Sequence, residues 1–205
     1  GVQMDSNGEI FFSGGTVSGD LPLAGTPFIG TAMGTADGFV VRYNAAGSMM
    51  VAGTRLGTAA YDQCYFIQLN GNDEVFVVGQ SMGDYPITPG KFANPNSLLF
   101  VHKLTHDLST SLWSTRLGNG STNAGFSPTA FLVSDCDQIY ISGWGGLSGP
   151  GIQGMPLTTD AFQSTTDGSD FHLMVLEAEA AALNYGTYFG GALSNEHVDG
   201  GTSRF

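Results

Sequence analysis

Short apolar runs alternate with polar turns along the whole chain, and most of the runs contain β-branched or aromatic residues. Runs of roughly four to eight such residues, bounded by Gly, Asn, Asp or Ser, are typical of β-strands. Three of the runs are alike, because each begins with an acidic or amide residue, continues with at least three consecutive apolar or aromatic residues and ends in glycine. They lie at 9–14, 74–79 and 138–143. The pattern predicts an all-β protein.

The same phrase recurs three times along the chain. Gly14, Gly79 and Gly143 are separated by 65 and 64 positions. A triplet of apolar residue, proline and apolar residue follows each glycine, at 21–23, 85–87 and 155–157. The last part of each phrase aligns without a gap, in closing blocks at 37–57, 98–118 and 170–190. A strand-built period of this length predicts a stacked or circular β architecture.

Each phrase contains four predicted strands: a leading strand, the strand that carries the repeated glycine, and two strands in the closing block. Four short strands per repeat are typical of a β-propeller blade, in which the strands form one antiparallel sheet. A blade cannot bury both of its faces alone, so neighbouring blades must cover them. The alternative is a β-sandwich whose hairpins resemble one another by accident.

The predicted blades span residues 1–57, 58–118 and 119–190, and residues 191–205 begin a further blade. The first blade holds only the end of its leading strand. Three blades do not close a ring, because rings typically use about four to eight. We therefore expect a larger ring, completed by more of the same protein or by partner chains. We also expect apolar sheet faces at the two outer blades, and association of residues 1–205 when they are isolated.

Composition narrows the classes of partner. The chain has 18 acidic and 6 basic residues, for a net charge of −12. Nucleic acids and anionic lipid surfaces both require a basic footprint, so neither is an expected partner. No apolar run approaches the roughly 20 residues of a membrane span. Only 12% of the residues are charged, so Ser, Thr, Asn and Gln must supply much of the surface polarity, as is common in extracellular β proteins.

The two cysteines, Cys64 and Cys136, do not occupy equivalent positions in their repeats. Their spacing excludes a CxxC metal or redox motif. A disulfide between them remains open at this point, although a buried free thiol or a partner cysteine elsewhere is favoured.

The sequence predicts no catalytic residue, no metal ligand and no cofactor. The acidic residues are scattered in turns, where Asp caps the backbone. Residues 5–9 alternate oxygen ligands but are shorter than a helix-loop-helix calcium loop, which favours a hairpin turn over a cation site. The histidines lack metal-binding spacing and are interpreted as surface or strand-packing residues. They are His102, His106, His172 and His197.

Trp144 is the one candidate binding residue. It is expected directly after the second strand of its blade, between Gly143 and Gly145, with a loop at 147–156 behind it. Glycines beside an aromatic ring can expose its face to a sugar. The alternative is that the ring packs between adjacent blades.

Two groups of segments carry a resemblance. Residues 5–14, 37–44 and 47–48 resemble the bacterial β-propeller repeat family called SBBP, and the similarity extends over the whole chain. Three segments of the last repeat are also similar to large surface proteins of gliding bacteria that carry a gliding-motility-associated C-terminal domain and use the type IX secretion system. These segments are 139–146, 166–171 and 196–205. The middle repeat departs from the pattern, because Leu98 replaces Asp37 and Asp170.

The resemblance implies a propeller segment of a long secreted or cell-surface protein without enzymatic activity. Such a segment acts as a scaffold, adhesin or interaction platform. Its expected partners are other domains of the same protein, a surface protein or a glycan. Two alternatives stay open: a lectin-like propeller that binds carbohydrate or peptide, and a secreted hydrolase or lyase whose paired carboxylates assemble across blades.

Overall fold

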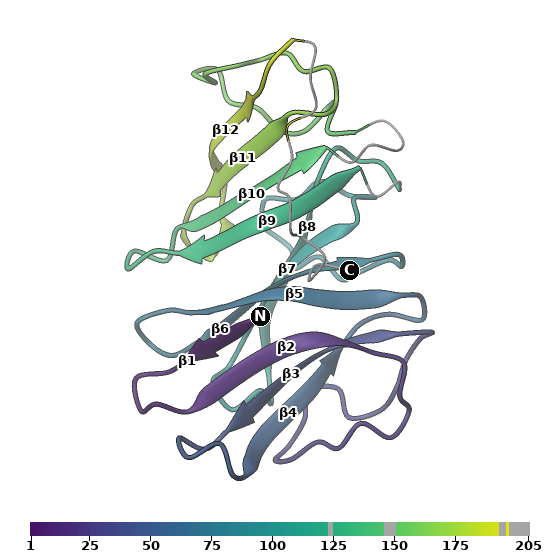
Figure 1. The fold of residues 1–205 in the computed structure, drawn as a ribbon, viewed down its shortest axis with the longest axis vertical. Coiled ribbons are helices and arrows are strands. Elements are labelled where there is room, and N and C mark those ends of the chain that lie inside the picture. Colours follow the sequence, from purple (N-terminus) through teal and green to yellow (C-terminus); the bar gives the residue numbers. More distant parts are fainter. Residues whose placement is uncertain (123–124, 146–150, 193–195, 197–205) are drawn as a thin grey trace. The chain divides into compact units, whose positions relative to one another are not determined.

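The computed structural model describes residues 1–122, 125–145, 151–192 and 196 (Figure 1). Its strands form three four-stranded antiparallel sheets in which each strand pairs with its neighbour in sequence. The first sheet consists of β1 (Val2–Met4), β2 (Ile10–Thr16), β3 (Asp37–Tyr43) and β4 (Met50–Leu56). The second consists of β5 (Asp62–Leu69), β6 (Val75–Ser81), β7 (Leu99–Leu104) and β8 (Ser111–Leu117). The third consists of β9 (Phe126–Val133), β10 (Ile139–Gly145), β11 (Phe171–Leu176) and β12 (Leu183–Phe189).

The all-β class and the four strands per repeat are thus confirmed. The sheets lie within residues 1–57, 58–118 and 119–190, the ranges expected for single blades. Most of the segment expected to begin a further blade, 193–195 and 197–205, lies outside the described residues. The sequence did not predict the three-residue 3-10 turn η1 (Ala178–Ala180), which connects β11 to β12.

The repeated glycines occupy equivalent positions, as predicted. Each faces the third residue of its closing block across the sheet: Gly14 pairs with Phe39, Gly79 with Phe100, and Gly143 with His172. The paired rings explain Gly14 and Gly79, because a β-carbon there would lie 3.0 Å from the ring of Phe39 and 2.4 Å from the ring of Phe100. At Gly143 the close ring is that of Phe126, at 2.6 Å. One detail of the prediction was wrong: each strand continues for two residues beyond its glycine.

By their packing, the described residues form two compact units. Unit 1 comprises Gly1–Thr88 and Leu99–Thr115, and unit 2 comprises Pro89–Leu98 and Arg116–Phe205. In unit 1 the first and second sheets share one apolar core, to which Phe11 and Val40 contribute from one sheet and Val77 and Phe100 from the other. Tyr85 of the second proline triplet stacks on Phe100 at 3.9 Å between ring centroids. The expectation that a neighbouring sheet covers an apolar face is met for this pair.

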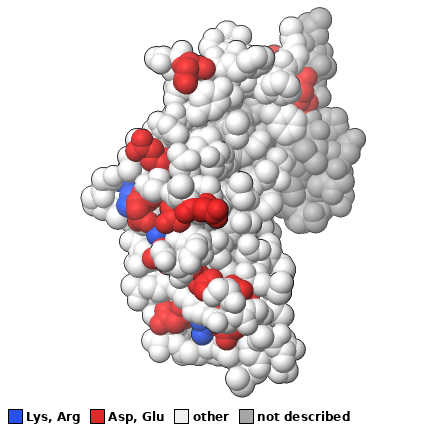
Figure 2. Space-filling model, turned by 90° about the vertical axis from the view of Figure 1, so that its left-hand side faces the viewer, with Lys and Arg blue, Asp and Glu red and all other residues white. Residues whose placement is uncertain are grey.

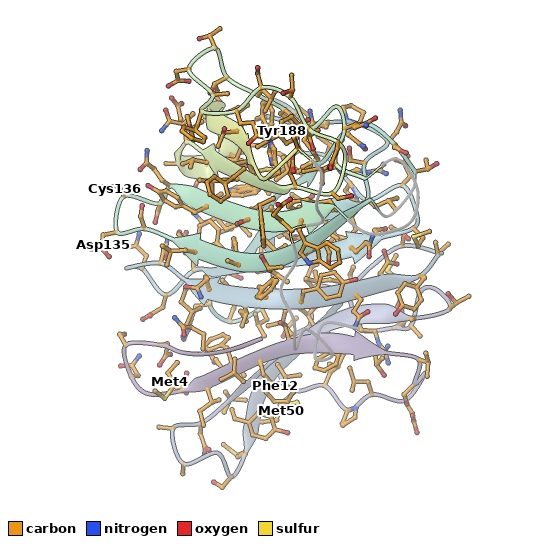
Figure 3. The ribbon with its side chains drawn as sticks, turned by 45° about the horizontal axis from the view of Figure 1, so that its top comes forward. Met4, Phe12, Met50, Asp135, Cys136 and Tyr188 are labelled. Carbon is orange, nitrogen blue, oxygen red and sulfur yellow. The ribbon has the colours of Figure 1, made fainter. Side chains whose placement is uncertain are left out.

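The opposite face of the first sheet also carries apolar side chains. Val2, Met4 and Phe12 share this face, because Val2 pairs with Phe12 and side chains two residues apart in a strand point the same way. Val2 and Met4 are 70% and 64% exposed. Phe12 is half-buried and stacks on Tyr43 at 5.8 Å (Figure 3). The first sheet therefore carries exposed apolar residues on the face opposite the shared core.

Unit 2 is built around the third sheet. Ile139, Ile141 and Met174 are fully buried in it, and Ile152 from the loop between β10 and β11 joins them. Tyr188 of β12 donates its hydroxyl hydrogen bond to the carbonyl of Ile152 at 3.1 Å (Figure 3). This bond connects the long loop to the edge of the sheet, where the acidic pocket described below is found.

Candidate functional site

Trp144 lies inside β10 and pairs with Phe171, so its expected position after the strand was wrong. Its side chain is half-buried. The neighbouring Gly145 has a packing role, because a β-carbon there would lie 1.8 Å from the carbonyl oxygen of Gly168. The first part of the loop expected behind the ring, 147–150, falls outside the described residues. The glycine next to Trp144 is therefore explained by a close backbone approach.

Two histidines are buried in strands, which confirms the strand-packing interpretation for them. His102 has the Tyr85 hydroxyl 2.7 Å from its Nδ1 and the Ser111 hydroxyl 2.8 Å from its Nε2. Burial lowers the pKa of His102 to about 3. His172 donates from Nε2 to the carbonyl of Pro156 at 2.9 Å, and burial lowers its pKa to about 4 despite that bond. Both rings are neutral at pH 7. His197 is outside the described residues.

His106 behaves differently, because it joins an acidic cluster in unit 1. Asp5, Asp73 and His106 place potential ligand atoms within 4.8 Å of one another. His106 Nε2 lies 2.8 Å from an Asp5 carboxylate oxygen, and Arg42 Nη1 donates to His106 Nδ1 at 2.6 Å. Because a guanidinium only donates, Nδ1 accepts and Nε2 carries the proton given to Asp5. A chain of hydrogen bonds therefore runs from Arg42 through His106 to Asp5.

The donors already present satisfy this cluster. Asp5 accepts the backbone N–H groups of Asn7 and Glu9 at 2.9 and 2.8 Å, which confirms the predicted hairpin turn. Burial raises the pKa of Asp5, but these bonds and the one from His106 outweigh it and leave the pKa below its usual value. Asp73 accepts from both the backbone and the hydroxyl of Ser6. The cluster includes the positive charge of Arg42, and its hydrogen bonds join the first sheet to the second sheet within unit 1.

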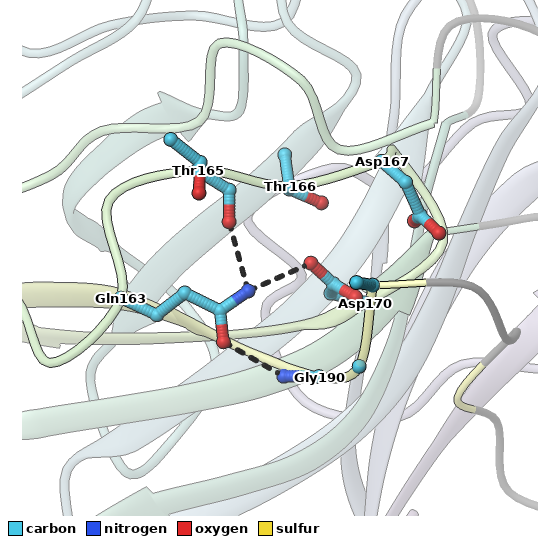
Figure 4. A pocket seen from close by; sticks show the side chains of 8 residues that line it. Gln163, Thr165, Thr166, Asp167, Asp170 and Gly190 are labelled. Atoms are coloured by element: carbon cyan, nitrogen blue, oxygen red, sulfur yellow. Dashed lines mark hydrogen bonds between the residues drawn. The ribbon is translucent and has the colours of Figure 1, made fainter.

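A second acidic site lies in unit 2, around a pocket of about 420 Å³ at the ends of β11 and β12 (Figure 4). The pocket is lined by Gln163, Thr165, Thr166, Asp167, Asp170, Gly190, Gly191 and Ala192. Gln163 Nε2 donates to the Thr165 carbonyl at 2.8 Å and to Asp170 Oδ2 at 3.0 Å. Its Oε1 accepts the Gly190 N–H at 3.1 Å. These three bonds fix the amide and, through it, the Asp170 carboxylate.

Asp170 is the unusual group in this pocket. Its side chain is 0% exposed, and its Oδ1 is buried without a hydrogen-bond partner. A β-carbon at Gly190 would lie 2.1 Å from that Oδ1 and 2.7 Å from Glu196 Oε2, so both carboxylates converge on this glycine. Burial is the main cause that raises the pKa of Asp170, and a hydrogen bond from Thr166 opposes it. The charge of Asp167, a hydrogen bond between the Asp170 and Glu196 carboxyl groups and the charge of Glu196 raise the pKa further.

The first repeat contains the corresponding site in unit 1. Asp37 opens its closing block as Asp170 does, and Asp62 takes the place of Glu196. The backbone supports this equivalence: Asp62 N–H donates to the residue before Asp37 at 2.9 Å, and Glu196 N–H to the residue before Asp170 at 3.2 Å. In the first repeat, however, Arg55 Nη1 lies 3.0 Å from Asp37 Oδ2, with both side chains buried.

In the other two repeats, one member of the Asp37–Arg55 pair is replaced by another residue. In the middle repeat Arg116 is retained while Leu98 replaces the aspartate, and Arg116 Nε donates to the Ser97 carbonyl at 2.7 Å. In the last repeat the aspartate is retained while Tyr188 replaces the arginine. Asp170 is therefore the version of this carboxylate whose closing block contains no arginine.

Neither the comparisons with known proteins nor the distribution of surface charge identifies a function for this chain. No protein-family model matches the chain, and no curated protein is significantly similar to it in sequence. No helix within the described residues is long and apolar enough to cross a membrane. Figure 2 shows acidic side chains in separate groups on one face, with the few basic side chains beside them. An assignment of function must therefore rest on the fold and on the two acidic sites.

Proposed function

We propose that the three sheets are consecutive SBBP-type propeller blades, and that the chain is a non-enzymatic scaffold, adhesin or interaction segment of a large secreted or cell-surface protein. The observation that carries the proposal is the repeated register of Gly14, Gly79 and Gly143 against the closing blocks of three equal sheets. Propellers are built from such repeated four-stranded units. The apolar core shared by the first two sheets is the way in which neighbouring blades bury each other.

The extracellular part of the proposal is supported by composition and by resemblance. Few residues are charged, and 31 glycines supply tight turns. The similarity to surface proteins of gliding bacteria makes the type IX secretion system the proposed route. Other domains of the same protein, a surface protein or a glycan are the proposed partners.

The acidic pocket at Asp170 supports a scaffold better than it supports a hydrolase. A retaining glycosidase places its two carboxyl groups about 5–5.5 Å apart, on either side of the bond to be cleaved. Asp170 is 0% exposed and converges with Glu196 on one glycine, so no substrate bond fits between the two. These carboxylates are therefore better explained as a binding or structural pair than as an acid and a nucleophile.

Localisation of the full-length gene product tests the proposal. An epitope-tagged copy in the organism that carries the gene is expected at the cell surface or in the medium, and to be degraded when intact cells are treated with protease. A strain without the type IX system should retain it inside. Recovery of the protein in the cytoplasm of both strains would refute the export proposal. Turnover of chromogenic glycosides or esters by the 205-residue chain would refute the non-enzymatic part.

A further inference from the structure

We propose that a second copy of this chain covers the exposed apolar face of the first sheet, and that it does so with the exposed face of its own third sheet. The first of these faces is defined by Val2, Met4 and Phe12 (Figure 3). The second carries Leu132 and Phe189. The sequence predicted association of the isolated chain but no pairing of faces. The proposal rests on the blade part of the proposed function and is independent of export.

The interface inside unit 1 shows which faces pack together. The first sheet contributes Phe11 to the shared core, and the second sheet contributes Val77. When the repeats are aligned on Gly14 and Gly79, the counterpart of Val77 is Phe12. Successive side chains of a strand point to opposite faces, so the two sheets meet through opposite kinds of face. We call these the Phe11-type face and the Val77-type face.

The exposed face of the first sheet is of the Val77 type. Strand pairing makes Val2 the counterpart of Ile67, because Val2 pairs with Phe12 and Ile67 pairs with Val77. Ile67 is 2% exposed, whereas Val2 is 70% exposed. The position that the first sheet covers in the second repeat thus lies open in the first repeat. The packing in unit 1 indicates that the matching partner is a Phe11-type face.

The third sheet presents such a face. By the same alignment Tyr140 is the counterpart of Phe11, and Phe189 is the counterpart of Leu56. Phe11 and Leu56 are fully buried in unit 1. Phe189, in contrast, is 62% exposed, and Leu132, which pairs with Tyr140, is 53% exposed. The chain therefore carries both halves of the interface in exposed form, and two copies can pair them head to tail.

The packing in unit 1 also predicts which turns meet between copies. Ser6, in the turn after β1, donates its N–H to the carboxylate of Asp73, in the turn after β5, at 3.1 Å. The alignment makes Asp135 the counterpart of Ser6 and Gly8 the counterpart of Asp73. If the third sheet of one copy packs on the first sheet of another in the same way, residue 135 of one copy lies beside residue 8 of the other.

Sedimentation velocity of the purified 205-residue chain tests the association. We expect at least twice the mass of one chain, and dissociation on dilution. Met4→Asp and Phe189→Asp should each weaken association at least about tenfold, because a charge would be buried at the contact. Both side chains are exposed, and circular dichroism verifies that each variant is folded. Val17→Asp is the control, because Val17 is 83% exposed in the loop after β2 and outside both faces.

Mixing the two variants tests the orientation. The Met4→Asp chain keeps the face of its third sheet, and the Phe189→Asp chain keeps the face of its first sheet. The mixture should therefore associate at concentrations at which neither variant associates alone. An unmodified chain that stays monomeric overturns the proposal, as does association that neither substitution weakens. A mixture that does not recover would show that like faces pair, which also overturns it.

Cysteine cross-linking in a Cys136→Ser background locates the contact. A short bis-maleimide should link Asp135→Cys chains to Gly8→Cys chains but should link neither variant to itself. A side chain at residue 8 is tolerated, because its counterpart Asp73 has a φ of 57°. Linkage between two chains of one variant would refute head-to-tail contact. Ser6→Cys with Asp73→Cys should cross-link inside one chain. Failure of this control would contradict the blade packing itself, whereas its success in a monomeric chain would contradict only the second copy.

Discussion

The buried ion pair between Arg55 and Asp37 offers the most direct test of the energetics of the repeats. Arg55→Met removes the guanidinium but keeps most of the apolar stem. It deletes the 3.0 Å contact to Asp37 and the 2.7 Å hydrogen bond to the Ser18 carbonyl. Asp37 keeps only long hydrogen bonds, of 3.2–3.3 Å, from the N–H groups of Met33 and Gly34. Its charge is then left buried with little compensation.

The expected loss is about 3–5 kcal/mol, the usual cost of removing one partner of a buried ion pair. Both side chains are at most 2% exposed, so solvent does not screen the remaining charge. Such a loss is a large part of the roughly 5–15 kcal/mol that stabilises a typical domain. The double variant Asp37→Asn, Arg55→Met should recover about 2 kcal/mol relative to Arg55→Met alone, because no isolated charge remains.

Urea unfolding followed by tryptophan fluorescence measures these values. The chain has two tryptophans, and in a Trp144→Phe background the emission comes from Trp113, which lies in unit 1 with the ion pair. A loss below about 1 kcal/mol for Arg55→Met would mean that the pair behaves like an exposed one, and the reasoning would fail. So would a double variant whose loss equals the sum of the two single losses.

Three further predictions follow from other parts of the structure. Gly79→Ala should lower the free energy of unfolding by about 2–4 kcal/mol in urea titrations, because its β-carbon would lie 2.3 Å from a backbone oxygen; Gly71→Ala, with open space around it, should change it little. Burial lowers the pKa of His102 from 6.5 to about 3, so between these values the unfolded chain binds more protons than the folded one. Unfolding measured at several pH values should therefore show stability decreasing as the pH is lowered from 6.5 to 3, by at most about 1.4 kcal/mol per pH unit for this group, and His102→Gln should reduce the slope. Ellman's reagent should modify the exposed Cys136 in the folded chain. It should react with Cys64 only in denaturant, because that thiol is buried and burial raises its pKa. Rapid reaction of both thiols in the folded chain would contradict this.

The strands and their grouping could be predicted from the sequence because strand signals are local. Alternating apolar residues and turn residues define each hairpin, and the gapless closing blocks align their members. The equivalence of Gly14, Gly79 and Gly143 was predicted from spacing alone and is confirmed by the register. The ends of strands were less well predicted, as Trp144 shows, since the length of a strand depends on its partner. The disulfide left open by the sequence is absent, because Cys64 and Cys136 are both free.

The acidic sites could not be predicted in the same way. Asp5 and His106 are 101 residues apart, and only the packing of the first sheet on the second brings them together. For the pocket, the aligned closing blocks did contain a signal, because tyrosine replaces arginine at residue 188. The meaning of that exchange depends on knowing that Asp37 and Arg55, on neighbouring strands, form a buried ion pair. A comparison of aligned positions in pairs, rather than one at a time, would have found it.

The three repeats keep one backbone arrangement and vary the charges placed on it. The pairs at the two coupled positions are Asp37 with Arg55, Leu98 with Arg116, and Asp170 with Tyr188. The backbone pairing is therefore common to the three sheets, whereas the charge at these two positions is specific to each repeat. A buried aspartate is tolerated beside an arginine in the first repeat and beside a fixed glutamine amide in the last, and the middle repeat avoids the buried charge altogether.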